Sequence, residues 1–305
     1  MERLFILGCG SALPASGRNP TAQVLEHAGK FFLIDCGEGT QSRLRESKLS
    51  FDKITHIFIS HLHGDHYLGL PGLISTMQLL GRERELVLYG PKALWDILQL
   101  QFNASNTRVS FPFSFVEVDA EKELLDTSNI NVSSIKLNHR ISCFGFIFKE
   151  KPKQRRINGL LVKQLEVPNY FMNNLRAGQD YTSSSGELYK NEFLTFPPRK
   201  SHSYAFCSDN RIKANFSDKL KGVSILYHES TFLHKELPRA RKTFHTTVKE
   251  AAELAVEVKP DLLILGHYSA RYKELKELKM EANSIFDSVL MGEDRLVVNF
   301  EKIEC

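Results

Sequence analysis

The sequence predicts a mixed α/β fold in which short apolar strands end in residues that bind metals. Apolar runs rich in β-branched and aromatic residues, such as residues 57–59 and 262–265, are typical of buried strands. Histidine or aspartate stands at or just after the end of several of these runs. With 305 residues, of which 42% are hydrophobic, the chain has enough apolar residues for one large domain or two tightly joined halves.

The N-terminal part of the chain predicts three strands, at residues 4–7, 21–26 and 31–34. A turn of small residues, 8–12, follows the first strand, and its glycines allow the backbone to pass close to a substrate or another turn. A plain tight turn is the better explanation of this segment. The third strand ends at Asp35, whose carboxylate either accepts a hydrogen bond from a metal-bound histidine or caps a helix.

The densest pattern of ligand-type residues is the run His61-Leu62-His63-Gly64-Asp65-His66, which follows the strand at 57–59. Residues 67–73 are then expected to begin a helix. Side chains two to five residues apart converge in a tight strand-to-helix turn, where three imidazoles and a carboxylate crowd their lone pairs unless a cation lies between them. This ligand set favours zinc over manganese or iron. The alternative is a polar loop that is rich in histidine by chance.

Three later strand ends carry the same kind of residue. Strands are predicted at residues 86–89, 113–118, 130–137, 204–207, 225–229 and 262–266, with a helix at 93–100. His139, Asp209 and His267 follow three of these strands. Taken singly, Asp209 and His267 are better explained as caps or surface residues, and His139 as a surface or core histidine. Together with the His61 motif, they predict one shared metal site.

Two further residues are candidates for acid–base chemistry. Glu229 stands at the end of a predicted strand, and His245 lies just before a helix predicted at residues 248–258. Thr246 or Thr247 caps that helix, which leaves His245 outside it and free to point into a cleft. A solvated loop histidine is the alternative.

Composition indicates which classes of protein the sequence fits. A net charge of +4 is mild, and no apolar run reaches the length of a membrane span or of a signal-peptide core, so no membrane partner is expected. The cysteines form no C-x-x-C pair and have mostly strand-like neighbours, which predicts buried, reduced thiols in a cytoplasmic protein. These residues are Cys9, Cys36, Cys143, Cys207 and Cys305.

Residues 149–200 hold ten Lys/Arg and five Asp/Glu, a net charge of +5, so the rest of the chain is close to neutral. Prolines and a Ser-Ser-Ser-Gly run interrupt this segment, with short helices expected at 157–165 and 171–175. We predict an inserted basic arm that binds a phosphate backbone. A solvated insertion or a dimer contact is the alternative. A second basic cluster is expected around the mouth of the cleft: Lys235, Arg239, Arg241 and Lys242.

Taken together, the metal motif, the ligands at strand ends and the His-Thr-Thr helix start resemble the metallo-β-lactamase superfamily and, within it, the ribonuclease Z family. Ribonuclease Z enzymes trim the 3′ trailer from precursor tRNA. The resemblance covers nearly all of residues 1–305. The first metal motif is shared by many hydrolases, whereas residues 228–232 and 245–252 match far fewer families. The matching segments are residues 33–41, 61–66, 69–73, 228–232 and 245–252.

This resemblance implies a four-layer αββα sandwich with two Zn²⁺ ions at the rim between its sheets. His61, His63 and His139 would hold one zinc ion, and Asp65, His66 and His267 the other. Asp209 would bridge the two ions, Asp35 would support a ligand, and Glu229 would orient His245. The arm at 149–200 would grip precursor tRNA in a cytoplasmic homodimer. The arm lacks the family's glycine-proline-rich tip, and Ser208 and Asn210 replace the glycine and threonine that usually flank the bridging acid.

In the implied reaction, a hydroxide activated by two zinc ions attacks the scissile phosphorus. Asp65 orients or deprotonates this nucleophile, and His245 protonates the departing 3′ oxygen. The main alternative is a small-molecule phosphodiesterase or another hydrolase of the same superfamily, which has little use for a basic arm. A second alternative is a catalytically silent tRNA-binding protein, which has no use for a complete ligand set.

Overall fold

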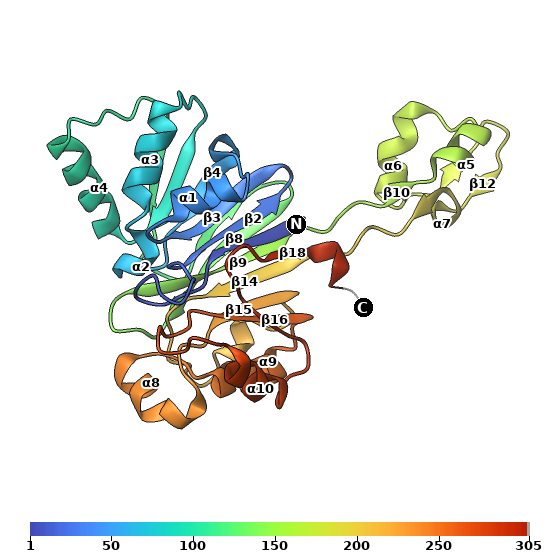
Figure 1. Cartoon of the computed structure of the whole chain (residues 1–305). Helices are drawn as coiled ribbons and strands as arrows, with labels where there is room; N and C mark the ends of the chain where they lie inside the picture. The colour runs from blue at the N-terminus through green and yellow to red at the C-terminus, as the bar shows by residue number, and fades with distance from the viewer. Residues whose placement is uncertain (304–305) are drawn as a thin grey trace.

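A computed structural model describes residues 1–303 of the protein, so Cys305 lies outside the described part. Two seven-stranded sheets pack face to face, with helices on the outer face of each, and a small separate body projects from one end (Figure 1). The fold class predicted from the sequence, an αββα sandwich, is confirmed. In the described residues no helix has the length and apolar character needed to cross a membrane.

The first sheet contains the N-terminal strands and one strand from the C-terminus. Its spatial order is β18 (Val297–Asn299), β1 (Arg3–Gly8), β2 (Ala22–His27), β3 (Lys30–Cys36), β4 (Ile54–Phe58), β5 (Leu86–Gly90) and β6 (Phe113–Glu117). The strands from β3 to β6 are parallel to one another. Its helices are α1 (Thr40–Glu46), α2 (Gly64–Tyr67), α3 (Leu70–Leu79) and α4 (Lys92–Ala104), with a 3₁₀ turn at Phe51–Lys53.

The second sheet is built from the rest of the chain. Its spatial order is β17 (Val289–Met291), β16 (Leu262–Gly266), β15 (Ile225–Glu229), β14 (Ser203–Cys207), β9 (Cys143–Glu150), β8 (Ile130–Leu137) and β7 (Glu123–Asp126). The strands from β14 to β17 are parallel. Its helices are α8 (Leu237–Thr243), α9 (Val248–Val258) and α10 (Lys276–Asn283), with 3₁₀ turns at Ser217–Lys219, His234–Glu236 and Phe300–Lys302.

Strands buried on both faces explain why the chain forms four layers. In β1, Leu4 and Ile6 join the core between the sheets, whereas Phe5 and Leu7 join the core beneath the outer helices. Alternate side chains of a strand point to opposite faces, so continuous apolar runs bury both faces of the sheet. Between the sheets, the Phe58 ring lies 5.3 Å from the Phe148 ring, edge to face.

The elements expected from the sequence are present, with two kinds of difference. The helix expected to begin within residues 67–73 is α3, but the short helix α2 precedes it and already contains His66. Several elements were not predicted: β7, β17, β18 and α10 are short, whereas β9 is a strongly apolar strand whose signal was overlooked. The described cysteines, Cys9, Cys36, Cys143 and Cys207, are buried and unpaired, as predicted.

The projecting body joins the second sheet between β9 and β14, which are neighbouring antiparallel strands. It has its own small apolar core of Val162, Val167, Leu175, Tyr181 and Leu194. We call residues 151–200 the arm (Figure 1, right). Its elements are β10 (Arg156–Ile157), α5 (Gly159–Gln164), a 3₁₀ turn at Asn169–Phe171, α6 (Met172–Arg176), β11 (Tyr181–Thr182), β12 (Leu188–Tyr189), α7 (Asn191–Leu194) and β13 (Thr195–Phe196).

The positive charge of this region lies on the two connecting segments and not on the head of the arm. Residues 149–156 and 197–200 carry +6 in total, whereas the head, residues 157–196, carries three cations and four carboxylates, a net charge of −1. Four cations of the connecting segments pair with carboxylates of the sandwich, and these ion pairs fasten the arm to it. These pairs are Lys151–Asp126, Lys153–Glu150, Arg199–Glu301 and Lys200–Asp261.

Candidate metal centre

The seven predicted ligand side chains converge at the rim where the parallel strands of both sheets end, and His245 lies with them. The turn after β4 and helix α2 supply His61, His63, Asp65 and His66 from the first sheet. The second sheet supplies His139 after β8, Asp209 after β14 and His267 after β16. Because parallel strands end at the same edge, residues far apart in the sequence become neighbours.

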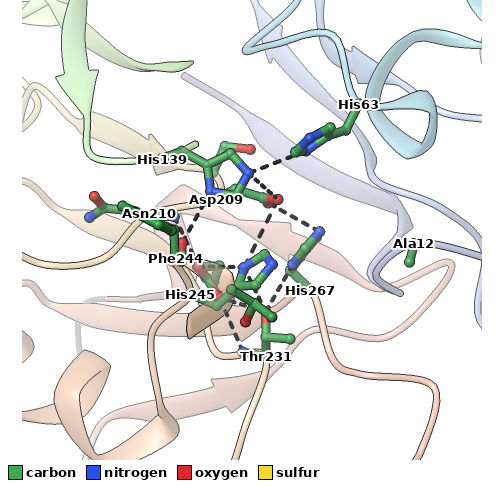
Figure 2. A network of polar contacts seen from close by, with 12 residues as sticks. Ala12, His63, His139, Asp209, Asn210, Thr231, Phe244, His245 and His267 are labelled. Carbon is green, nitrogen blue, oxygen red and sulfur yellow. Dashed lines mark hydrogen bonds and ion pairs between the residues drawn. The ribbon is translucent and has the colours of Figure 1, made fainter. Parts of the chain in front are cut away.

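Four of these residues form a first cluster. His63 Nδ1 lies 3.0 Å from His61 Nε2 and 3.2 Å from His139 Nε2. Asp209 Oδ2 lies 3.6 Å from the same two Nε2 atoms. Figure 2 shows His63 and His139 turned toward Asp209.

The second cluster lies on the other side of Asp209. His267 Nε2 is 3.3 Å from both His66 Nε2 and Asp65 Oδ2. Asp209 Oδ1 lies 3.1 Å from His267 Nε2 and 3.4 Å from His66 Nε2. One carboxylate oxygen of Asp209 therefore faces each cluster.

The spacing of these atoms fits divalent metal ions. Four nitrogen or oxygen ligands around a tetrahedral zinc ion, each about 2.0–2.1 Å from it, lie about 3.3 Å from one another. The ligand atoms of the two clusters approach one another to 3.0–3.6 Å. Asp209 Oδ1 is buried and makes no hydrogen bond within residues 1–303, and a bound cation would satisfy it. The two clusters thus have the ligand types and the spacing to hold metal.

Hydrogen bonds at Nδ1 fix the tautomers of the four histidines whose Nε2 atoms point into the two clusters. His66 Nδ1 donates to Asp35 Oδ2 at 2.7 Å, and His139 Nδ1 donates to the Phe244 carbonyl at 3.1 Å. His61 Nδ1 contacts Ser60 Oγ, and His267 Nδ1 contacts Thr231 Oγ1, both at 3.0 Å. Such partners orient metal-bound imidazoles and raise their basicity.

Asp35 holds the His66 ring and does not cap helix α1. Helix α1 has Gly39 as its N-cap and no side-chain cap. Besides His66, the Asp35 carboxylate accepts hydrogen bonds from the backbone N–H and hydroxyl of Ser60, at 2.8 and 2.9 Å. Burial raises the pKa of Asp35, although its contacts with His66 and Ser60 oppose that rise.

The turn at residues 8–12 approaches both another turn and the metal centre. A Cβ atom on Gly8 would lie only 1.9 Å from the Pro20 carbonyl oxygen, so this close approach requires glycine. Ala12 adopts a left-handed conformation with φ of 64°, and its N–H donates to Asp65 Oδ2 at 2.7 Å. The turn therefore orients one of the predicted ligands.

His245 stands beside the clusters, with Glu229 behind it. His245 Nδ1 lies 3.0 Å from Glu229 Oε1, and the backbone N–H of Asn210 donates to the same oxygen at 2.9 Å. Thr231 Oγ1 donates to Glu229 Oε2 at 2.6 Å. Burial disfavours a charged imidazole, but the negative charges of Glu229 and Asp209 outweigh it and raise the pKa of His245 to about 9.

Helix α9 begins immediately after this histidine. Thr247 is the N-cap and forms a capping box with Glu250, so of the two predicted caps Thr247 is the one used. His245 lies outside the helix and lines a cavity of about 350 Å³, together with His63, Asp65, Asp209 and His267. Arg140 is the only Lys or Arg among the residues that the described structure places around this cavity.

Sequence reasoning did not identify the supporting residues Ser60, Thr231 and Phe244 or the cavity residue Arg140. Ser60 and Arg140 are sequence neighbours of His61 and His139, and Thr231 lies two residues after Glu229. Their position beside a predicted site residue at the end of a strand was the signal that could have identified them. The contribution of Phe244 is a backbone carbonyl, which residue type does not reveal.

Comparisons with known proteins agree with this geometry. The family model described as "Anti-Pycsar protein Apyc1" matches residues 2–155. A ribonuclease Z of Bacteroides fragilis is 41% identical over 298 residues, which cover 97% of this chain and 98% of that protein. A ribonuclease Z of Cytophaga hutchinsonii is 42% identical over 95% of this chain and 93% of its own length.

Among solved structures, the short form of human tRNase Z matches with a TM-score of 0.68 and 26% identity, over 97% of this chain and 98% of that one. A metallo-β-lactamase fold protein of Bacillus subtilis, YhfI, has a TM-score of 0.69 at 17% identity over 97% and 98% of the two chains, which supports the fold. The chain belongs to the Apyc1 family through residues 2–155, and over nearly its whole length it belongs to the ribonuclease Z family.

Proposed function

We propose that the protein is a metal-dependent endoribonuclease that removes the 3′ trailer of precursor tRNA. The observation that carries this proposal is the position of Asp209, which faces three histidines with one oxygen and a second ligand cluster with the other. Relatives named ribonuclease Z support the substrate class.

Zinc is the ion that we propose at both sites, because imidazole and carboxylate ligands at this spacing suit it. His61, His63 and His139 would hold one ion, Asp65, His66 and His267 the other, and Asp209 both. Bound there, two such ions supply a hydrolytic nucleophile near neutral pH and neutralise charge on the phosphoryl group.

The protein's own groups divide the remaining work. Asp65 lines the cavity and is held by the Ala12 N–H, which suits it to orient the attacking water. His245 lines the same cavity with Nδ1 bound to Glu229, which leaves Nε2 as the atom that donates a proton to the departing 3′ oxygen. The P–O3′ bond breaks, and the tRNA retains a 3′-hydroxyl.

We propose that the arm holds the tRNA. Of its cations, Arg155, Arg156, Lys163 and Arg176 pair with no carboxylate in the described residues, which leaves them available to phosphates. The head also exposes aromatic side chains, Tyr170 at 80% and Phe193 at 57% of their surface. Exposed rings of this kind stack on unpaired bases.

The position of the arm is consistent with the homodimer that we propose. Strand β14 begins at the arm and runs toward Asp209, so the arm and the metal centre lie at opposite ends of this strand. A second subunit would bring another arm to the substrate. We also propose a cytoplasmic location, supported by the buried, unpaired thiols of Cys9, Cys36, Cys143 and Cys207.

The deciding experiment incubates the zinc-loaded protein with a precursor tRNA and maps the cut. We expect one cut at the start of the trailer, a 3′-hydroxyl on the tRNA and loss of cleavage on chelation. Efficient hydrolysis of small phosphodiesters without any tRNA cleavage would instead identify a small-molecule phosphodiesterase. Mixing an arm-deleted variant with an Asp209→Ala variant tests the dimer, because activity recovered on mixing requires two subunits in one complex.

A further inference from the structure

A second cavity lies beside the metal centre, on the side of His139. Its volume is about 870 Å³. We call the cavity of about 350 Å³ that His245 lines the catalytic cavity, and Arg140 lines both cavities. His245 does not line the larger cavity. We call this larger cavity the side groove, and it is lined by residues 119–121 and 136–142, Lys213 and Lys219.

The two carboxylates of the side groove are already neutralised. Glu121 pairs with Lys219 and also accepts the backbone N–H of Lys136, at 2.9 Å. Asp119 pairs with Lys122 at 2.6 Å. Neither acid is therefore free to repel an anion or to bind a metal ion by itself.

Three cations of the side groove have no carboxylate partner within residues 1–303. They are Lys136, Arg140 and Lys213, and all three side chains are exposed. Arg140 follows His139 directly, and Lys213 comes four residues after Asp209. The loops that carry two of the metal ligands thus also carry two of the free cations.

The third cation is held by the sheet. Lys136 is the exposed residue between the buried Ile135 and Leu137 of β8, so the strand fixes the direction of its side chain toward the groove. Three cations without a carboxylate partner thus line a groove that shares Arg140 with the catalytic cavity. A strand of nucleic acid carries one phosphate per nucleotide and is the ligand that such a groove suits.

We propose that the side groove binds the phosphates of the single-stranded 3′ trailer, an inference that rests on the proposed endoribonuclease function. Water adds to phosphorus, the P–O3′ bond breaks and the 3′ oxygen takes a proton, so the phosphoryl group stays on the trailer. His245, the proposed proton donor, marks the side of the tRNA 3′ end. His139, whose ring lies 5.3 Å from that of His245, lines the side groove, whereas His245 does not. We therefore assign the groove to the following phosphates of the trailer.

The size of the groove and its lining suit a single strand. A cavity of about 870 Å³ that is lined by His139 has room for a single chain of nucleotides. The exposed apolar side chain in its lining, Ile141, offers a surface for a base without reading its identity. We therefore expect binding that depends on trailer length but not on trailer sequence.

The test compares substrates that share one tRNA body and differ in trailer length. The parent protein should cleave a substrate with a trailer of several nucleotides at a higher kcat/KM than one with a single nucleotide. In the Lys136→Ala/Lys213→Ala variant this advantage should disappear, whereas the single-nucleotide trailer should be cleaved at the parent rate. For the long trailer, the slope of log kcat/KM against log salt should flatten by about 0.7 for each phosphate that the variant no longer neutralises.

A matched control removes two exposed lysines elsewhere, Lys30→Ala/Lys279→Ala, and should keep the length advantage. If the Lys136→Ala/Lys213→Ala variant keeps it too, the groove does not bind the trailer. If the variant loses activity equally on both substrates, with zinc content unchanged, the groove binds the tRNA side of the cut, and the proposal is also wrong. If the parent protein cleaves neither substrate, the proposed function itself fails.

Discussion

Nδ1 of His245 lies 3.0 Å from Oε1 of Glu229, and Glu229 is fully buried while the ring of His245 reaches the catalytic cavity. This pair stands beside the seven proposed metal ligands without belonging to them. Acid–base chemistry and metal binding should therefore be separable by mutation.

Replacing His245 by alanine tests the proposed proton donor. We expect tRNA cleavage to slow by about 10²–10⁴-fold, the usual contribution of a general acid. Zinc content, measured by elemental analysis, should match that of the parent protein. A variant that cleaves at the parent rate, or one that has lost zinc, removes His245 from the proposed role.

The Glu229→Gln variant tests whether Glu229 acts through His245. Cleavage should slow less than in His245→Ala, because the ring remains but has lost its charged partner. The Glu229→Gln/His245→Ala double variant should be no slower than His245→Ala alone, since the two effects share one route. Additive losses in the measured rates would show that Glu229 has an independent role, such as holding the Asn210 and Thr231 backbone.

The position of Asp209 predicts an asymmetric pattern of metal loss. Asp209→Ala should weaken both sites, because each of its oxygens faces one cluster. His63→Ala should weaken only the first cluster and leave close to one ion per chain. Zinc titration followed by elemental analysis distinguishes the two, and equal losses in both variants would contradict a bridging carboxylate.

Asp35→Asn tests the support of His66. The amide retains an oxygen but loses the charge that fixes the His66 tautomer, so metal affinity should fall by about 10–100-fold. The arm at the other end of the sandwich provides the control, since Lys163→Ala should leave metal affinity unchanged. Competition with a chelator measures the affinities.

Deleting residues 152–200 tests the arm. Strands β9 and β14 are adjacent and antiparallel, so a two-residue Asn-Gly turn can close the gap. Zinc content and hydrolysis of a small phosphodiester should survive, whereas tRNA cleavage should fall steeply. The exposed ion pairs that the deletion removes, Arg199–Glu301 and Lys200–Asp261, each contribute under about 1 kcal/mol. The buried Glu150 loses Lys153 but keeps the N-terminal amine of Met1 as a partner, so folding should survive as well.

A milder variant separates the charge of the arm from its shape. Arg155→Ala/Arg156→Ala removes two cations without carboxylate partners and should weaken tRNA binding. Its control, Lys151→Ala, removes a cation that already pairs with Asp126 and should weaken binding less. Binding measured across a salt series checks both, and equal losses would show that paired and unpaired cations of the arm contribute alike.

The sequence by itself determined the residues and the local geometry. His61, His63, Asp65 and His66 lie within one turn, so their spacing alone indicated a metal site. Apolar strands indicated a sheet fold, and the resemblance to a known family supplied its four layers. The capping of α9 was also local, because Thr247 and Glu250 are three residues apart.

Only the tertiary structure decided relationships between distant residues. The sequence left two equally good explanations for Asp35. In the structure, β3 and β4 are adjacent and parallel, and Asp35 Oδ2 lies 2.7 Å from His66 Nδ1. The two-sided position of Asp209 requires both sheets to end at one rim. The sequence likewise showed a basic segment but not its pairing, because the carboxylates that pair with Lys151, Arg199 and Lys200 lie far away in the sequence. Such contacts depend on packing over long sequence separations, which local residue patterns do not specify.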